Sequence, residues 1–302
     1  MKTIILLGPT ATGKTELSIE LAKNLNGEII SADSMQVYRG MDIGTAKPTL
    51  EERQGIPHHL IDLRDPDQEW TVADFVGETQ KLKTEIPNRG RAPIIVGGTG
   101  LYLWSLLEGF AFPITPADKE LRDRLEKLPT STLYARLSTI DPEAASKIHP
   151  NDKKRIIRAL EVHELTGEPI SKLQERRTSN VERGTQEYKL VGLNLPREEL
   201  YARINKRVDS MIEKGLIEEV KGLLAKGYSK QLFSFQALGY KEVLEYLDKK
   251  WTKEEMIEEL KKRTRNFARR QMTWFRRFKN ASWFLPGEMD KILALLAQSN
   301  RT

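Results

Sequence analysis

A glycine-rich loop near the N-terminus constrains the fold of this chain most. The apolar run 3–7 leads directly into the pattern G-x-x-x-x-G-K-[ST], made by Gly8, Pro9, Thr10, Ala11, Thr12, Gly13, Lys14 and Thr15. In such a loop the glycines let backbone N–H groups point at an anion, the lysine adds a positive charge, and the final hydroxyl can bind Mg²⁺. Because a helical pattern follows at 16–22, we predict a phosphate site between a buried strand and a helix. The loop alone leaves the phosphate compound open.

Two more strands predict a parallel sheet. Residues 28–32 form an apolar run that ends at Asp33, and residues 92–96 form another that ends at Gly97-Gly98-Thr99-Gly100, before a helix from Leu101 to about Leu107. Strands that alternate with helices at this spacing are typical of a doubly wound α/β sheet of the P-loop NTPase type, with right-handed crossovers. Ligands bind at the carboxyl ends of such strands.

The rest of the chain is predicted to be mainly helical. Residues 115–188 contain short helical segments rich in Lys, Arg and Glu, which we interpret as a helical insertion domain. A strand at 189–195 then returns the chain to the sheet, so 1–114 and 189–302 form the catalytic core with its C-terminal helices. From Arg197 on we expect only helices, with ends at Gly215 and Gly227.

A basic segment lies near the C-terminus. Residues 261–279, which we expect to be one helix, contain nine Lys or Arg and no acidic residue. Phe267, Trp274 and Phe278 share an apolar face, while Arg265, Arg269 and Arg276 share another. The charged face is either solvated or follows a phosphate backbone, and its single sign favours phosphate contact.

Composition excludes several classes of protein. The chain has 302 residues, a net charge of +6 and no cysteine, so disulfides and thiolate zinc sites are ruled out. No apolar stretch approaches the roughly 18 residues of a membrane span, so we expect no membrane partner and a cytoplasmic location.

The residues able to carry chemistry are few. The third strand ends in Gly-Gly-Thr and lacks the Walker B aspartate of hydrolytic NTPases, which leaves Asp33 as the acid nearest the loop. Asp33 and Thr99 either line the site or cap local turns. Arg203 and Arg207, one helical turn apart, are either solvated or clamp a diphosphate. His58 and His59 lack a third ligand at metal spacing, so we interpret them as structural.

Several strings together resemble one family, the bacterial tRNA dimethylallyltransferases or isopentenyl-tRNA transferases. They are residues 8–15, 31–48, 97–102, 151–162 and 264–276, and they span nearly the whole chain. The resemblance implies transfer of a dimethylallyl group from dimethylallyl diphosphate to the exocyclic amine of the adenosine just 3′ of the tRNA anticodon. It also implies Mg²⁺ on Thr15, and we expect the protein to be monomeric.

The resemblance assigns roles to individual residues. Asp33 matches the general base, Thr99 a group near the reacting adenine, and Lys14 and Arg207 the cations on the diphosphate. The implied contacts with the tRNA anticodon stem-loop, some made by the insertion, are at Asp33, Ser34, Met35, Gln36, Thr99, Arg122, Lys154, Arg155, Arg158, Gly239, Tyr240, Arg265 and Arg269.

Two other functions remain open from the residues alone. An ATP-dependent kinase of a small metabolite fits the loop and Asp33 equally well, but it leaves the basic, aromatic segment 261–279 unexplained. A non-catalytic RNA-binding protein would not need Lys14, Thr15 and Asp33 together.

Overall fold

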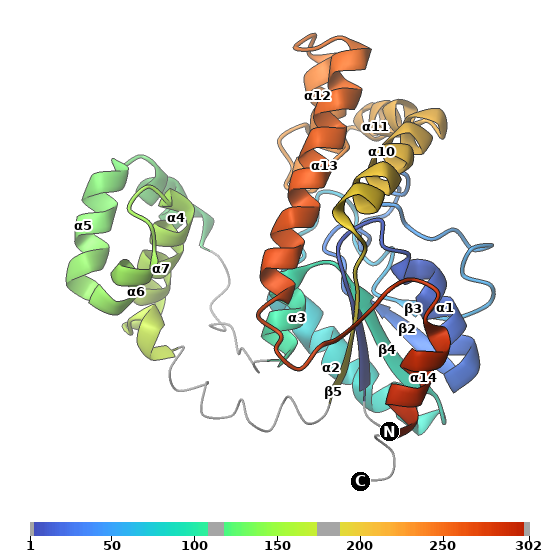
Figure 1. Ribbon diagram of the computed structural model, residues 1–302. Helices are drawn as coiled ribbons and strands as arrows, with labels where there is room; N and C mark the ends of the chain where they lie inside the picture. Colours follow the sequence, from blue (N-terminus) through green and yellow to red (C-terminus); the bar gives the residue numbers. More distant parts are fainter. Residues whose placement is uncertain (1–2, 108–117, 174–187, 299–302) are drawn as a thin grey trace. The chain divides into compact units, whose positions relative to one another are not determined.

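A six-stranded parallel sheet forms the core of the computed structural model, which describes residues 3–107, 118–173 and 188–298 (Figure 1). The spatial order is β3-β2-β4-β1-β5-β6, and each neighbouring pair is parallel. The strands are β1 (Thr3–Leu7), β2 (Gly27–Ser31), β3 (His58–His59), β4 (Ala92–Gly97), β5 (Tyr188–Leu193) and β6 (Ser282–Phe284). The predicted α/β class with a parallel sheet is therefore confirmed.

The four central strands β2, β4, β1 and β5 are buried on both faces of the sheet, which explains their largely apolar sequences. Strand β1 lies between β4 and β5, with Ile5 opposite Ile95 on one side and Leu190 on the other. All residues of β1 are buried. This pairing brings the carboxyl ends of β1, β2 and β4 to one edge of the sheet, where the predicted site residues follow.

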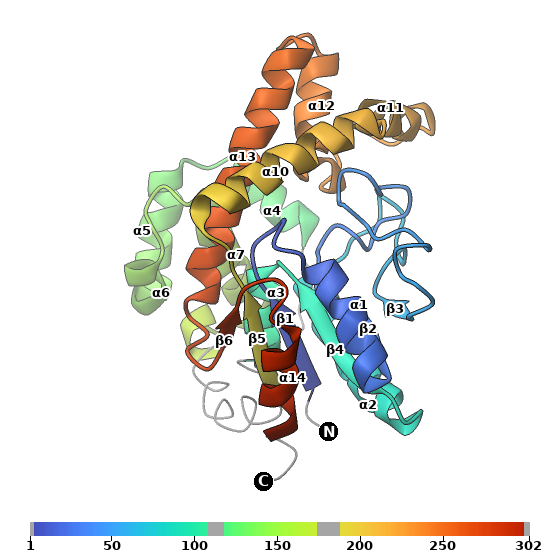
Figure 2. The same ribbon diagram turned by 45° about the vertical axis from the view of Figure 1, so that its right-hand side comes forward.

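Helices cover the two faces of the sheet. On one face α1 (Lys14–Leu25) and α14 (Met289–Gln298) pack against Ile4 and Leu6 in one apolar cluster. The helices α2 (Val72–Asn88) and α3 (Gly100–Leu107) lie on the opposite face, where Phe75 stacks on Tyr102 at 4.3 Å between ring centroids (Figures 1 and 2).

A third group of helices lies beyond the carboxyl ends of the strands. It comprises α10 (Arg197–Glu213), α11 (Leu216–Ala225), the 3₁₀ turn η2 (Ser234–Gln236), α12 (Tyr240–Leu247) and α13 (Lys253–Phe275). Helices α10 and α13 cross side by side (Figure 2). Ala11 of the glycine-rich loop packs with Ile204 of α10 and Ala268 of α13. These helices therefore form one wall of the site.

The chain divides into two compact units, Met1–Leu103 with Glu187–Thr302, and Trp104–Gln186. The described part of the second unit contains α4 (Lys119–Glu126), α5 (Thr130–Ile140), α6 (Pro142–Lys147) and α7 (Lys153–Thr166). These helices surround a core of Leu133, Leu137, Ile156 and Leu160. The bounds predicted for the insertion, 115–188, stay a prediction, because 108–117 and 174–187 lie outside the described residues.

Three expectations about the elements were wrong. Strand β3 was not expected, and β6 lies in a region predicted to be wholly helical. Both are too short to show the alternation that marks a strand. The basic helix was expected at 261–279, but α13 begins at Lys253 because Thr252 and Glu255 form a capping box there, and it ends at Phe275. Arg276 and Phe278 therefore lie beyond its last helical residue.

Candidate active site

The glycine-rich loop has the backbone conformation that its glycines permit. Gly8 has φ +154°, and a Cβ atom there would lie 2.5 Å from the Leu193 carbonyl oxygen of β5. Gly13, in the left-handed region with φ +89°, precedes the first residue of α1. Lys14 then folds back so that its Nζ donates to the Pro9 carbonyl oxygen at 2.7 Å. The loop thus curls around the N-terminus of α1, as a phosphate cradle requires.

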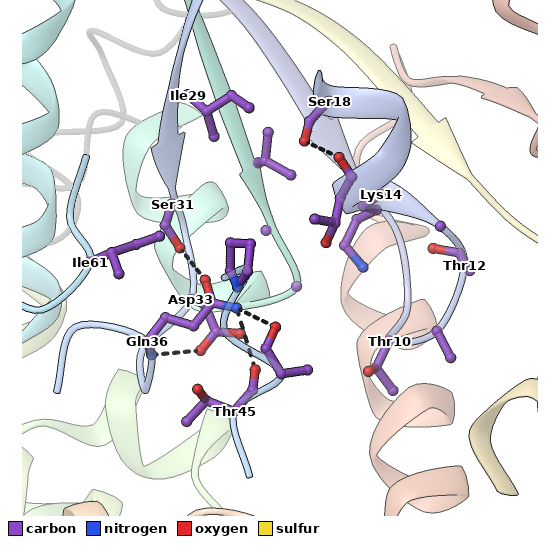
Figure 3. Close-up of a pocket in the computed structure, with 18 of the residues that line it drawn as sticks. Thr10, Thr12, Lys14, Ser18, Ile29, Ser31, Asp33, Gln36, Thr45 and Ile61 are labelled. Atoms are coloured by element: carbon purple, nitrogen blue, oxygen red, sulfur yellow. Dashed lines mark hydrogen bonds between the residues drawn. The ribbon is translucent and has the colours of Figure 1, made fainter. Parts of the chain in front are cut away.

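The loop lines a cavity of about 110 Å³. Thr10 to Thr15 form one side of it, and Ser31, Asp33 and Gln36 lie after or at the end of β2 on another. The side chains of Lys14 and Asp33 lie on opposite sides of this cavity (Figure 3). The structure therefore brings together the predicted phosphate loop and the predicted base.

Asp33 serves as a turn cap and also faces the cavity. Its Oδ1 accepts from the backbone N–H groups of Met35 at 2.9 Å and Gln36 at 3.3 Å. Burial raises the pKa of this carboxyl, while these N–H groups and the cations of Lys14 and Arg207 oppose the rise. Both interpretations made from the sequence therefore apply to one residue, and its carboxylate is a stronger base than an exposed one.

Two cations face Asp33. Burial, together with the charge of Arg207, lowers the pKa of Lys14 to about 7, although Asp33 acts in the opposite direction. Arg207 of α10 donates from Nη1 to the Thr10 hydroxyl at 3.2 Å and lines the cavity. Arg203, one turn earlier, is exposed and pairs with Glu199 at 2.8 Å. Of the predicted pair, Arg207 lines the cavity, whereas Arg203 lies near Gly13 outside it, and contact of either with a diphosphate stays a prediction.

A second cavity, of about 350 Å³, adjoins the first. Asp33 and Arg207 line both, together with Thr10, Thr45, Ala46 and Phe267. Thr99 lines the second cavity, and its hydroxyl accepts from the Ser34 N–H at 3.2 Å. Much of the remaining wall is apolar and comes from Met35, Val208, Met211, Ala237, Leu238 and Leu260. The acid and the arginine therefore lie between the cavity of the glycine-rich loop and a largely apolar chamber.

Comparison with known proteins identifies the family. The family model described as IPP transferase matches residues 36–278, which is most of the chain. The chain belongs to the IPP transferase family. The tRNA dimethylallyltransferase of Caldanaerobacter subterraneus is 50% identical over 291 residues, which cover 94% of this chain and 91% of the relative. That of Carboxydothermus hydrogenoformans is 52% identical over 299 residues, with coverage of 96% and 94%.

Solved structures of IPP transferases have the same fold. The full-length tRNA isopentenylpyrophosphate transferase from Bacillus halodurans superposes with a TM-score of 0.73 and 46% identity, over 99% of this chain and 96% of the other. A eukaryotic dimethylallyltransferase, described as acting on tRNA, gives a TM-score of 0.76 and 34% identity, over 91% and 69% of the two chains.

Several residues expected to contact RNA in this IPP transferase make internal bonds. The Gln36 side chain accepts from the Ser31 hydroxyl at 2.9 Å and lies 3.3 Å from the Thr45 carbonyl oxygen. The Tyr240 ring is fully buried, and its hydroxyl donates to Glu219 at 2.6 Å. The Gly239 N–H donates to Glu242 at 2.7 Å. The RNA contacts of these residues stay predictions, but the described bonds give each one a structural role.

The three predicted RNA-binding arginines of the second unit also have carboxylate partners. Arg122 and Arg158 both bond to the fully buried Glu161, at 2.8 and 2.7 Å. Arg155 pairs with Asp152 at 2.6 Å, and Lys154 is exposed. On α13, Arg265 donates to Asn205 at 2.6 Å and Arg269 to Asn266 at 2.8 Å. Their contacts with tRNA remain predictions.

Two residues that matter to the site were missed. Glu219 of α11 accepts from the backbone N–H groups of Asp42 at 3.0 Å, Ile43 at 2.8 Å and Gly44 at 3.2 Å. It thereby orders the loop that carries Thr45 and Ala46 into both cavities. Gln271 of α13 bonds to the glycine-rich loop. Gln271 lies within the matching string 264–276, but no role was predicted for it, and Glu219 lies in none of these strings. Only the proximity of distant segments reveals what the two side chains contact.

The donors at the first cavity that suit Mg²⁺ are oxygens. Within the described ranges no group of three His, Cys, Asp or Glu side chains is placed to hold one. His59 contacts Glu28 at 2.6 Å, and His58 contacts the Ile56 carbonyl oxygen at 2.8 Å. The Thr15 hydroxyl and the Asp33 carboxylate line the first cavity, and both are hard donors of the kind Mg²⁺ prefers when phosphate oxygens complete its shell.

The described helices include none that is long and apolar enough to cross a membrane.

Proposed function

We propose that this protein transfers a dimethylallyl group from dimethylallyl diphosphate to the exocyclic amine of the adenosine 3′-adjacent to the anticodon in tRNA, releasing diphosphate. One observation carries the proposal: Asp33 and Arg207 line both the phosphate-loop cavity and the largely apolar chamber. A kinase needs a polar acceptor site at this point, whereas an allylic diphosphate has one charged end and one apolar end. Relatives about half identical over nearly the whole chain are named for this activity, which favours it over the kinase.

The phosphate loop would stabilise the leaving group. As the allylic C–O bond breaks, negative charge grows on the diphosphate, and Lys14, Arg207 and the N–H groups at the start of α1 surround the cavity that would hold it. Preorganised charges of this kind lower the barrier because they need no rearrangement during the reaction. Mg²⁺, held by the Thr15 hydroxyl and phosphate oxygens, would supply further charge neutralisation when bound.

Asp33 would act at the other reacting atom. The adenine amine nitrogen forms a bond to the allylic carbon and loses a proton, which the Asp33 carboxylate accepts. The raised pKa of Asp33 supports this role, because a buried carboxylate takes up a proton more readily than an exposed one. Thr99, on the wall of the same chamber, would bond to the adenine.

The apolar chamber would hold the prenyl chain and the base. Val208, Met211 and Phe267 line it and limit water near the allylic carbon. An adenosine in an anticodon loop reaches such a chamber only after it leaves its stack, which costs a few kcal/mol. Ser34 and Met35 line the chamber and would contact the flipped base. We further propose that Arg269 and the exposed Lys154 bind tRNA phosphates, and that the protein acts as a cytoplasmic monomer.

The test is a transfer assay with two labels. Purified protein, Mg²⁺ and tRNA bearing unmodified adenosine beside the anticodon are mixed with labelled dimethylallyl diphosphate or with γ-labelled ATP. We expect label in tRNA from the first donor and none from the second. Transfer from ATP to a small acceptor, or no transfer from dimethylallyl diphosphate, would overturn the proposal.

A further inference from the structure

A buried glutamine joins the two loops that line the site. Gln271 lies on α13, and its side chain is only 5% exposed. Its Oε1 accepts from the Thr10 N–H of the phosphate loop at 2.8 Å, and its Nε2 donates to the Gly98 carbonyl oxygen, between β4 and α3, at 2.9 Å. One amide group therefore satisfies a partly buried donor and a buried acceptor from segments almost ninety residues apart in the sequence.

The surroundings are built for this amide. A Cβ atom on Gly98 would lie 2.3 Å from Gln271 Nε2, so the close approach depends on a glycine at that position. The two bonded residues also sit next to residues of the site. Thr10 accepts from Arg207 through its hydroxyl, and Gly98 precedes Thr99. The amide thus spans the cavity wall between the phosphate side and the adenine side.

We propose that Gln271 is a positioning residue, which sets the separation of the phosphate loop from the Gly98–Thr99 turn. The identity of the two substrates rests on the proposed function, whereas the geometric role rests on the two hydrogen bonds alone. Since a misplacement of about 1 Å can cost roughly 100-fold in rate, a bridge between the two sides controls how well diphosphate and amine align. Helix α13 also contributes Phe267 to both cavities, so the helix and the two loops form one rigid frame.

The variants separate positioning from general stability. Gln271→Met keeps the length of the side chain but removes both bonds. Ile292→Val on α14 removes a methylene from the apolar cluster that α1 and α14 form with one face of the sheet. It serves as a control for stability. Thr273→Ala changes an exposed residue on α13 and serves as a control for the helix.

For Gln271→Met we expect kcat to fall about 10- to 100-fold, the affinity for inorganic pyrophosphate to fall several-fold, and the affinity for tRNA to stay within about twofold. All are measured well below the melting temperature. Normal values for kcat and pyrophosphate affinity, as expected for Ile292→Val and Thr273→Ala, would overturn the proposal. If the wild-type protein transfers no prenyl group, the proposed function fails, and pyrophosphate affinity still decides the role of Gln271.

A double mutant tests the contact directly. Gly98→Ala should be harmful alone because the new methyl group collides with Gln271 Nε2. In a Gln271→Ala background the methyl group enters vacated space, so the same change should have less than a third of its effect on kcat. If the fold-losses of kcat for the two single variants simply multiply in the double variant, the two residues act independently, and the proposed bridge is contradicted.

Discussion

At the scale of single residues, the site works through charges held away from water. Lys14 and Asp33 face one cavity, and burial shifts the pKa of each towards neutrality, downwards for the lysine and upwards for the acid. For Lys14 the shift brings the pKa to about 7, so this amine exchanges protons near neutral pH, and the shift makes the Asp33 carboxylate a stronger base than an exposed one. That property suits a base, and it also makes the binding of an anion dependent on pH.

Asp33 caps a turn and is also the proposed base, and a pair of variants separates the two roles. Asp33→Asn keeps an oxygen that can accept from the Met35 and Gln36 N–H groups, whereas Asp33→Ala loses both the turn and the base. We expect both to lower kcat by about 10²–10⁴-fold with pyrophosphate affinity retained, because both lack the base. The measurement is single-turnover transfer. An active Asp33→Asn with an inactive Asp33→Ala would assign the loss to the turn instead.

Lys14 predicts a pH dependence of diphosphate binding. Its pKa is about 7 in the free protein, and a bound anion raises it. Below pH 7 the amine already carries its charge, so affinity is full; above pH 7 binding must take up a proton, and affinity falls as pH rises. Calorimetry of pyrophosphate binding in buffers of different ionisation heat measures this uptake.

Lys14→Arg is the matched reference, because its guanidinium stays charged while pyrophosphate titrates identically. Equal proton uptake by the two proteins at pH 8 would contradict the prediction.

At the scale of elements, helix α13 contains two kinds of cation. Lys261, Lys262 and Arg263 pair with carboxylates, among them Asp209, Glu259 and Glu242. Arg269 donates to a neutral asparagine instead. Contact of this helix with phosphates therefore stays a prediction, and the ion pairs make it less favourable for the first cations than for Arg269. The first turns of the basic segment are neutralised within the protein, and phosphate contact is expected further along.

This division predicts different salt dependences for two equal changes of charge. Arg269→Gln should weaken tRNA binding and reduce the slope of log K against log salt concentration by about one. Lys262→Gln on the same helix should change the slope little, since Glu259 already neutralises that charge. Filter binding across a range of salt concentrations gives both slopes. Equal slopes for the two variants would favour a solvated face throughout.

At the scale of the whole molecule, the chain forms two compact units. The described residues that line both cavities all belong to the first unit, and α4 to α7 of the second have their own apolar core. Small-molecule binding and RNA binding should therefore be separable by mutation.

Lys154 tests this separation. It is an exposed residue on α7, and Lys154→Glu should weaken tRNA binding several-fold by repelling phosphates. Pyrophosphate affinity should be unchanged, because the cavity for it lies in the other unit. Titrations with each ligand check the prediction, with Lys119→Glu, also in the second unit, as a control for charge. A parallel loss of pyrophosphate affinity would show that the units do not act separately.

The sequence by itself determined the class of fold and the centre of the site. Continuous apolar runs, a glycine-rich loop and the spacing of strands and helices are local signals, and they placed Gly8 to Thr15, Asp33 and Thr99 at one edge of a parallel sheet. Strand β6 was not predicted, because three residues are too few to show the pattern of a strand, and its pairing with β5 is a contact between distant segments.

Only the tertiary structure decided which side chains face the site. Arg203 and Arg207 are one turn apart and equivalent in sequence, but the packing of α10 brings Arg207 to the Thr10 hydroxyl in the cavity wall, whereas Arg203 pairs with Glu199 at the outer edge of the loop, near Gly13. Packing likewise buries Tyr240, and it brings the Gln271 side chain within hydrogen-bond distance of Thr10 and Gly98. The physical reason is that periodicity defines the faces of a helix, whereas contacts between distant segments determine what each face meets.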